Sequence, residues 1–74
     1  METYRKNFWD NVNRLRENAG LSWSKMALRM GMNYNNLLQS KKNMNLPRID
    51  RLIDFSSALD CTPEDLIKDI FTDR

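Results

Sequence analysis

Apolar side chains recur along the first quarter of the chain with a helical period. The intervals between them are four, four, three and four residues: Tyr4, Phe8, Val12, Leu15 and Ala19. Side chains spaced this way share one face of an α-helix, so the spacing predicts an amphipathic helix over residues 4–18 with Phe8 and Leu15 in the core. Trp9, Asn13 and Arg16 fall off that face. Gly20 then ends the helix, because glycine takes a positive φ without a Cβ clash.

A second, shorter apolar face lies between Ser22 and Gly31. Met26, Ala27 and Met30 fall one helical turn apart and therefore lie on one side of a short helix. Ser22 is a good N-cap for it, because a serine hydroxyl can accept a backbone N–H bond. Gly31 ends it. The pattern predicts a short buried helix followed by a tight corner.

The segment after this corner carries more polar side chains than a helix that only packs against the core would need. Asn33 can cap a helix over residues 34–42, which Leu37 anchors in the core. The side chains aimed away from that anchor carry amides and a phenol: Tyr34, Asn35, Asn36 and Gln39. Asparagine and glutamine can bond adenine N6 and N7, so we interpret residues 34–42 as a DNA-reading helix, called the reading helix below. An asparagine-rich run also suits any tight corner, which is the alternative.

Residues 41–47 read as a polar loop that follows the reading helix. Polar side chains in and beside this loop are natural phosphate contacts. They are Lys41, Lys42, Asn43, Asn45 and Arg48. Ser22 and Trp23 are expected to join them, because free backbone N–H groups at the start of their helix attract a phosphate. Met44 and Leu46 point either back to the core or toward a second subunit.

Two further apolar faces follow in the last third of the chain. The first, over residues 48–59, gives a wide stripe that we expect to be buried: Ile49, Leu52, Ile53, Phe55, Ser56 and Leu59. The next helix has Thr62 as N-cap, Pro63 at its first position and Asp65 in a capping-box-like place. Its apolar face comprises Leu66, Ile67, Ile70 and Phe71. The last two of these either close the core or form a dimer seam.

Composition favours an all-helical chain and excludes several kinds of site. Of 74 residues, 41% are apolar and 30% charged, and only two are glycine and two proline. With one cysteine, Cys61, and no histidine, neither an internal disulfide nor a plausible zinc site is available, and we expect Cys61 to be a buried hydrophobe. No apolar run approaches a membrane span, and residues 1–11 lack a signal-peptide core. The expected location is the cytoplasm.

Charge is distributed unevenly along the chain. Residues 1–48 hold nine basic and three acidic residues, a net charge of +6, whereas residues 49–74 hold three basic and seven acidic residues, a net charge of −4. The first part contains the reading helix and would attract a phosphate backbone, while the second would face away from it. The alternative is that these charges only decorate solvated faces.

The order of these features resembles the helix-turn-helix domain of the phage repressor and Cro family, the Xre-like regulators. The residues that carry the resemblance follow that family's spacing without a gap: Leu15, Gly20, Leu21, Ser22, Ala27, Gly31, Leu37, Pro47, Leu59 and Leu66. The resemblance covers residues 8–67, with the helix-turn-helix core at 22–42. It implies an all-α fold, a compact five-helix bundle of the lambda-repressor-like helix-turn-helix type, and we expect residues 1–74 to form a single domain.

The resemblance also implies roles for residues of the reading helix. Tyr34, Asn35 and Gln39 match the family's base-contacting places, with Asn33 and Asn36 nearer the DNA backbone. We group Asn36 with the base contacts and Asn33 with the phosphate contacts. Leu38 departs from the pattern, because the family is usually polar there, and Ser40 departs because the family is usually apolar there. Either the helix is rotated and buries Leu38, or Leu38 faces DNA and touches a thymine methyl group.

Three more departures affect the surroundings of the reading helix. Trp23 stands where the family frequently has a glutamine that meets a phosphate, so it either flanks the DNA or packs on the core or a partner. Lys41 stands where the family often has a glutamate paired with an arginine at the place of Arg16, so that ion pair should be absent and Arg16 needs another partner or solvent. Asn43 replaces the family's usual glycine and is the next-best residue for a left-handed cap.

The function that the resemblance implies is sequence-specific DNA binding. Family members usually bind inverted-repeat operators as homodimers, so the expected partners are double-stranded operator DNA and a second copy, with repression as the usual result. A protein-interaction module on the same scaffold is the alternative, with an exposed patch of Trp9, Trp23, Leu38 and Met44. An enzyme is disfavoured, because no catalytic residues, metal ligands, cofactor or small-molecule ligand are evident.

Overall fold

Five helices follow one another in the computed structural model, which describes residues 3–73, and no strand forms within that range. They are α1 (Thr3–Asn18), α2 (Trp23–Met30), α3 (Tyr34–Lys42), α4 (Ile49–Leu59) and α5 (Pro63–Ile67). This is the all-α, five-helix arrangement of a small helix-turn-helix domain, as the resemblance implied. Helices α3 and α4 begin and end within a residue of the predicted positions.

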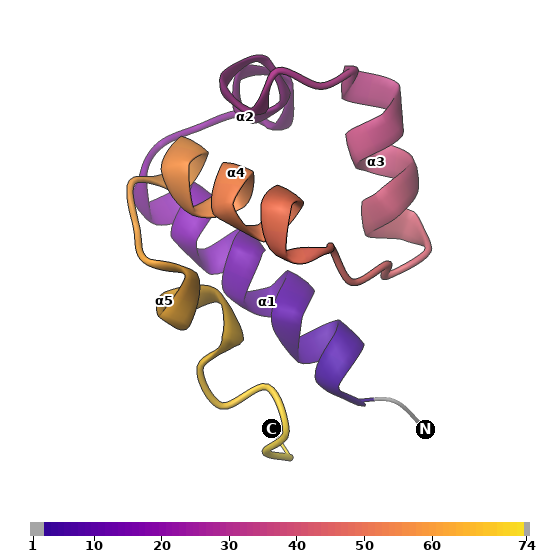
Figure 1. Cartoon of the computed structure of the whole chain (residues 1–74), viewed down its shortest axis with the longest axis vertical. Coiled ribbons are helices and arrows are strands. Elements are labelled where there is room, and N and C mark those ends of the chain that lie inside the picture. Colours follow the sequence, from indigo (N-terminus) through magenta and orange to yellow (C-terminus); the bar gives the residue numbers. More distant parts are fainter. Residues whose placement is uncertain (1–2, 74) are drawn as a thin grey trace.

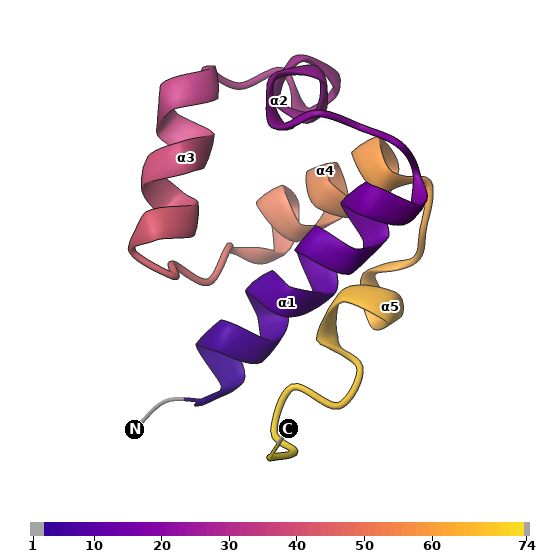
Figure 2. The same cartoon turned by 180° about the vertical axis from the view of Figure 1, so that it is seen from behind.

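Helix α4 lies across α1, while α2 and α3 form one end of the molecule (Figure 1). Helix α2 packs against both α3 and α4, and α1 packs against α4 and α5. Seen from behind, α1 runs diagonally across the molecule and α3 stands apart from it at one edge (Figure 2). Consequently α3 is held by α2 and by the loop that follows it, with one side turned away from the other helices.

The core gathers one or more apolar side chains from every helix. Phe8, Met26, Leu37 and Leu66 are among the largest fully buried side chains. Leu15, expected in the core, is half-buried and packs against this cluster. Three aromatic rings meet edge to face in the middle of the core, with centroids 5.5 to 5.7 Å apart: Phe8, Trp9 and Phe55. Such T-shaped pairs are favourable because the positive edge of one ring meets the negative face of another.

Trp9 is a correction to the sequence analysis, which placed it off the core face. Its side chain is 6% exposed, and its indole N–H donates to the backbone oxygen of Asn45 at 3.0 Å. The large ring reaches sideways into the core beside Phe8, and its one polar group finds a partner in the loop after α3. Trp9 therefore ties α1 to the loop that ends the reading helix.

The buried stripe predicted for α4 was too wide. Phe55, Ser56 and Leu59 are buried and Leu52 is half-buried, but Ile49 is 73% and Ile53 53% exposed. Ile53 precedes Phe55 by two residues, which at about 100° per residue places the two side chains on nearly opposite sides of the helix. The other helices cover one side of α4, so the two isoleucines remain outside.

The end of α1 and the start of α5 form as the sequence predicts. The φ angle of Gly20 is +69°, and Leu21 behind it donates its N–H to the oxygen of Arg16 at 3.1 Å, which closes α1. At α5, Thr62 and Asp65 form the predicted capping box, with N–H to side-chain oxygen distances of 3.2 and 3.0 Å. The Asp65 carboxylate accepts the backbone N–H of Thr62, and this hydrogen bond, followed by one from the Thr62 side chain, holds the pKa of that carboxyl below its ordinary value.

The chain after α5 divides between core and surface. Leu66 and Ile70 are buried, which completes the core, whereas Ile67 and Phe71 are exposed. Phe71 touches only the ring of Tyr4 among the described aromatic residues, with centroids 5.6 Å apart. Of the two residues whose role was left open, Ile70 closes the core and Phe71 does not.

Candidate nucleic-acid interface

The corner between α2 and α3 is built by two local devices. Gly31 takes a φ of +66°, and the N–H of the next residue, Met32, donates back to the oxygen of Ala27 at 3.0 Å. The side-chain oxygen of Asn33 then accepts the backbone N–H groups of Asn35 and Asn36, at 2.8 and 3.3 Å. Both were predicted. Together they fix the direction in which α3 leaves α2.

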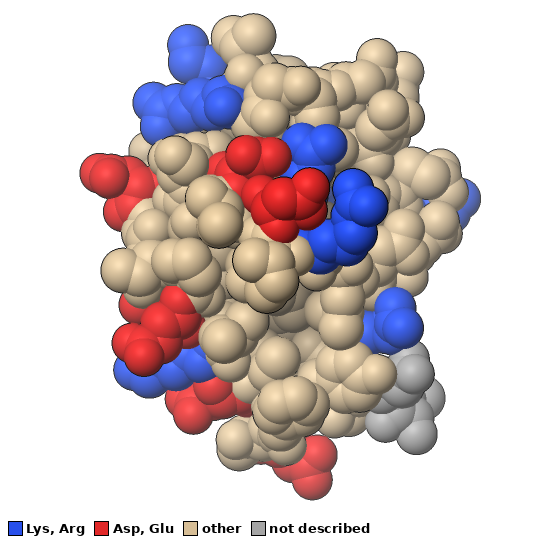
Figure 3. Space-filling model, viewed as in Figure 1, with Lys and Arg blue, Asp and Glu red and all other residues tan. Residues whose placement is uncertain are grey.

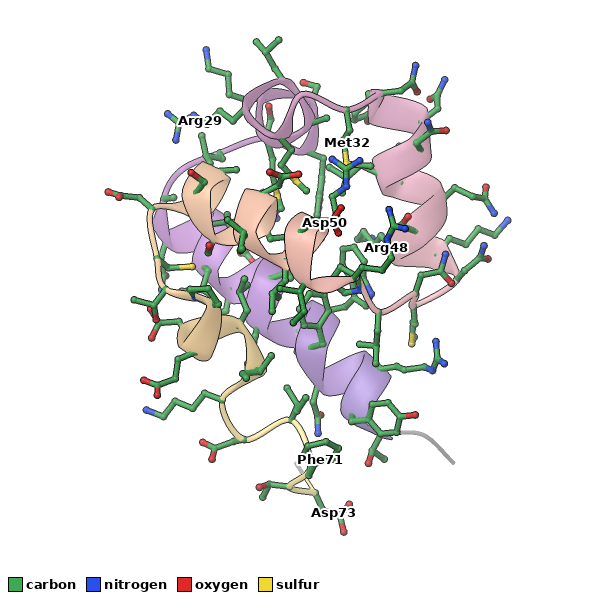
Figure 4. The ribbon with its side chains drawn as sticks, in the orientation of Figure 1. Arg29, Met32, Arg48, Asp50, Phe71 and Asp73 are labelled. Carbon is green, nitrogen blue, oxygen red and sulfur yellow. The ribbon has the colours of Figure 1, made fainter. Side chains whose placement is uncertain are left out.

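Leu37 fixes which side of α3 faces outward. Its side chain is 0% exposed, while the four residues predicted to contact bases are all exposed: Tyr34, Asn35, Asn36 and Gln39. Within residues 3–73 no hydrogen bond holds the side chains of these four residues, so their donors and acceptors are free for a ligand. Figure 4 shows α3 side chains ending in nitrogen and oxygen that extend away from the other helices.

The predicted phosphate contacts surround this exposed side. Lys41, Lys42, Asn43, Asn45, Arg48, Ser22 and Asn33 are all exposed. The Oγ atom of Ser22 accepts the N–H of Lys25 at 3.1 Å and so caps α2, as predicted. Because the Asn33 oxygen caps α3, only the amide NH₂ group of that side chain remains available to a phosphate.

Trp23 is half-buried and packs against the core cluster at the start of α2. Two cations lie over its indole ring: the guanidinium carbon of Arg16 at 4.6 Å from the ring centroid and the Nζ atom of Lys41 at 5.3 Å. The negative face of an indole ring attracts cations, and indole is the best of the aromatic rings for this. Trp23 therefore holds one basic residue of α1 and one of α3 next to the start of α2.

Arg16 finds partners that are not carboxylates. Its Nη1 atom donates to the backbone oxygen of Leu21 at 2.6 Å and its Nη2 atom to the Oδ1 atom of Asn13 at 2.8 Å. Its Nε atom is buried and has no hydrogen-bond partner within residues 3–73. The carboxylate expected in this family at the place of Lys41 is thus replaced by an indole ring, which Arg16 and Lys41 share.

The loop after α3 corrects one prediction. Asn43 has a φ of −83° and is not left-handed; the left-handed residue is Met44, at +53°. Helix α3 extends through Lys42, and the cap forms one residue later, where the N–H of Asn45 donates to the oxygen of Ser40 at 3.0 Å. This shift of one residue leaves the Met44 side chain on the surface and turns the Asn45 oxygen toward Trp9.

Arg5 is a basic residue of this region that the sequence analysis did not single out. Its Nη1 atom donates to the backbone oxygen of Met44 at 3.4 Å, across 39 positions of sequence. The start of α1 therefore lies beside the loop that ends the reading helix. No local pattern around Arg5 could indicate this, because the contact depends on how α1 crosses the rest of the fold.

Leu38 and Ser40 are both half-buried, so the register of α3 lies between the two alternatives. Leu37 remains the residue that faces the core, and Leu38 lies on a flank. Ser40 lines a cavity of about 100 Å³ together with Leu37 and Phe55. A small hydroxyl side chain thus stands at the place where the family is usually apolar, beside a space that it does not fill.

The exposed patch suggested for a protein-interaction module is not present as one surface. Trp9 is buried, Trp23 and Leu38 are half-buried, and only Met44 among the four is exposed. The indole ring of Trp23 is also occupied by two cations. A continuous apolar contact surface therefore cannot be assembled from these residues.

The surfaces over α3 and over α5 differ in the sign of their charge. Viewed as in Figure 1, the margin over α3 shows basic and no acidic side chains, while acidic side chains lie over α5 and the chain beyond it (Figure 3). Glu2 and Arg74, which enter the charges of the two parts of the sequence, lie outside the described residues. An exposed row of amides beside basic side chains can bind a polyanion and distinguish its bases.

Chemistry of other kinds finds little support in residues 3–73. No group of three metal-binding side chains occurs in that range, and none of its helices has the length and apolar character to cross a bilayer. Cys61 is half-buried against the core, and its thiol pKa is raised by burial and then by the carboxylates of Asp65 and Asp60. A raised pKa keeps the sulfur protonated and weakly nucleophilic.

Comparison with known protein families identifies the family of this chain. A family profile described as the Cro/C1-type HTH DNA-binding domain matches residues 6–72. That range contains the corner between α2 and α3, the exposed amides of α3 and the core that supports them. The matched family is one of DNA-binding domains and not of enzymes. No curated protein and no solved structure matches the chain.

Proposed function

The chain belongs to the family of Cro/C1-type helix-turn-helix DNA-binding domains, and we propose that it is a sequence-specific transcriptional regulator that acts as a repressor. Its partner is double-stranded operator DNA. Residues 1–74 act as one DNA-binding domain, and its place of action is the nucleoid in the cytoplasm. Repression follows when the bound protein covers promoter DNA.

The exposed side of α3 carries this proposal. Leu37 is fully buried beneath it, so the outward direction of the neighbouring side chains is fixed by core packing. In the proposed complex α3 enters the major groove, and the bases are contacted by Tyr34, Asn35, Asn36 and Gln39. Amide side chains can form paired bonds to adenine there, which gives sequence discrimination.

A ring of phosphate contacts positions the helix in the groove. We assign this role to Ser22, Trp23, Asn33, Lys41, Lys42, Asn43, Asn45 and Arg48. Seven of these side chains are exposed, while Trp23 acts mainly by holding Lys41 over its ring. Phosphate contacts fix register and orientation but carry no base information by themselves.

Two copies of the chain bind together in this proposal. A homodimer with two-fold symmetry presents two reading helices to successive major grooves, so the operator is an inverted repeat with half-sites about one helical turn apart. Two-fold symmetry in the protein then matches two-fold symmetry in the DNA.

Two substitutions test the assignment of base and phosphate contacts. A duplex selected from a random pool serves as operator, and a scrambled duplex is the control. Gln39→Ala should weaken binding to the selected duplex by about 1–3 kcal/mol and leave the scrambled duplex nearly unaffected. Lys42→Gln should weaken both duplexes alike and lower the slope of log Kd against log salt by about 1.

The same DNA titrations, carried out with the wild-type protein at several salt concentrations, provide the control and show which results would contradict the proposal. Wild-type binding must weaken steeply as salt rises, because counterions are released from the DNA. Equal effects of both substitutions on both duplexes would show that Gln39 does not read bases. Binding that does not depend on salt would overturn the DNA-binding proposal itself.

A further inference from the structure

Two isoleucines on α4 form an apolar face that the fold leaves uncovered. Ile49 is 73% and Ile53 53% exposed, and because they are four residues apart their side chains lie on the same side of the helix. Leu46, just before α4, is also exposed. We call Leu46, Ile49 and Ile53 the α4 face. It lies away from Phe55, the residue that anchors α4 in the core.

The charged residues around the α4 face are balanced in sign. Arg48 and Arg51 face Asp50 and Asp54, with an N–O distance of 3.7 Å between Arg48 and Asp50 and 3.2 Å between Arg51 and Asp54. Figure 3 shows acidic and basic side chains together in the middle of this side of the molecule, next to uncharged surface. Figure 4 places Arg48 and Asp50 at the start of α4 on the same side.

Three of the other exposed apolar side chains have charged neighbours in the sequence that are all or mostly of one sign. Leu28, also 73% exposed, has Lys25 three positions before it and Arg29 directly after it. Ile67 and Phe71 belong to the segment 60–73, which has five acidic residues and one basic residue. A second copy brought to either place would meet like charge, which is unfavourable. The balanced α4 face lacks that repulsion.

The position of the α4 face relative to α3 fits a two-fold pair. In the view of Figure 1, α4 lies in front of α1, and α3 stands at the right margin. A horizontal two-fold axis in front of this side would place a second copy toward the viewer with its α3 at the same margin. Both reading helices would then face one DNA duplex.

We propose that a second copy of this chain is the partner of the α4 face, so that the two copies associate through Ile49 and Ile53 around a two-fold axis. This proposal rests on the proposed binding to an inverted repeat and adds the surface through which the copies meet. In a two-fold contact, if one residue of the first copy contacts another residue of the second copy, the same two residues also make the reciprocal contact. We place Arg48, which lies 3.7 Å from Asp50 of its own chain, opposite Asp50 of the other copy, and two-fold symmetry then forms the reverse pair as well.

The isoleucines are tested by neutral substitutions with a matched control. Sedimentation equilibrium at rising concentration measures the mass of the protein without DNA. The wild-type mass should rise toward twice that of one chain, and Ile49→Gln combined with Ile53→Gln should weaken this association by about tenfold or more, because four apolar side chains lose their burial. Leu28→Gln removes an equally exposed leucine from α2 and should leave the association unchanged.

The charged pair is tested by exchange. Arg48→Asp alone and Asp50→Arg alone each place like charges opposite one another and should weaken association, while the double exchange should restore it. Restoration by the double exchange supports a two-fold contact at this place. A double exchange that remains as weak as the single ones would overturn it.

The proposal and the DNA-binding function can fail separately. A wild-type chain that stays monomeric at all concentrations, and binds one copy at a time to an inverted-repeat duplex, would overturn the α4 contact while leaving DNA binding intact. Equal loss of association in the Leu28→Gln control would also overturn it. Self-association that depends on Ile49 and Ile53, in a protein that shows no salt-dependent DNA binding, would retain the contact and reject the function.

Discussion

At the scale of single residues, two asparagines of α1 are buried in the core and stabilise the end of the chain by hydrogen bonds. Asn7 and Asn11 are 2% and 1% exposed, and each amide NH₂ group donates to two backbone oxygens in α5 or in the chain after it, at 2.7 to 3.0 Å. The accepting oxygens are those of Leu66, Lys68, Ile70 and Thr72. The end of the chain has little regular structure to bond its own carbonyls, and these amides satisfy them.

Replacing Asn11 should show how much this contact stabilises the fold. Asn11→Ala leaves two buried or part-buried carbonyls without their donor, so we expect the free energy of unfolding to fall by about 2 kcal/mol. Urea denaturation followed by circular dichroism measures it. Asn18→Ala, at the exposed end of the same helix, is the control and should change stability by no more than about 0.5 kcal/mol. Equal effects would mean that the Asn11 bonds contribute nothing specific.

At the scale of elements, the cap after α3 shows how a loop is set by more than its own sequence. Asparagine tolerates left-handed backbone better than methionine does, so local preference favours Asn43 for the cap. The fold instead makes Met44 left-handed, because the next residue, Asn45, must present its oxygen to the indole N–H of Trp9. A buried donor left without a partner is costly, and satisfying it offsets the strain at Met44.

Glycine substitutions at these two neighbours should have opposite signs. Met44→Gly removes the Cβ clash of a left-handed residue and should raise the free energy of unfolding by about 1 kcal/mol. Asn43→Gly places glycine at a residue with right-handed helical φ and should lower it by about 0.5–1 kcal/mol. Thermal and urea denaturation compare the two. The reverse order would mean that the cap lies at Asn43 in solution.

At the scale of the whole molecule, the basic side chains over α3 and the acidic side chains over α5 lie on different sides of the molecule (Figure 3). The molecule measures 31 × 22 × 22 Å along its principal axes, while charges in physiological salt are screened beyond about 8 Å. The acidic residues of α5 therefore do little to weaken attraction between α3 and DNA. They direct how the molecule faces a polyanion at long range in low salt.

A pair of single-charge changes should reveal this separation. Lys42→Gln and Glu64→Gln each alter the net charge by one, in opposite directions. At physiological salt Lys42→Gln should weaken binding to random duplex several-fold, whereas Glu64→Gln should change it by less than about twofold, because only Lys42 lies within a Debye length of the proposed DNA. Changes of equal size and opposite sign would show that net charge governs binding.

Local sequence patterns were enough to predict the helices, the corner between α2 and α3, and the residue beneath the reading helix. Each depends on neighbours within about one helical turn: Gly31 and Asn33 at the corner, Leu37 in α3, and the capping box of Thr62 and Asp65. These local preferences do not depend on contacts with distant parts of the chain, so the folded structure keeps them. The resemblance to a known family added the fold, which the family match over residues 6–72 confirms.

Contacts between helices that are distant in the sequence could be learned only from the folded molecule. Trp9 is buried because the loop after α3 accepts its N–H, Arg16 and Lys41 share the ring of Trp23, and Ile49 and Ile53 are exposed because the other helices cover one side of α4. Helical periodicity states which side chains share a face. It cannot state how much of that face the neighbours cover, since coverage depends on where helices distant in sequence cross.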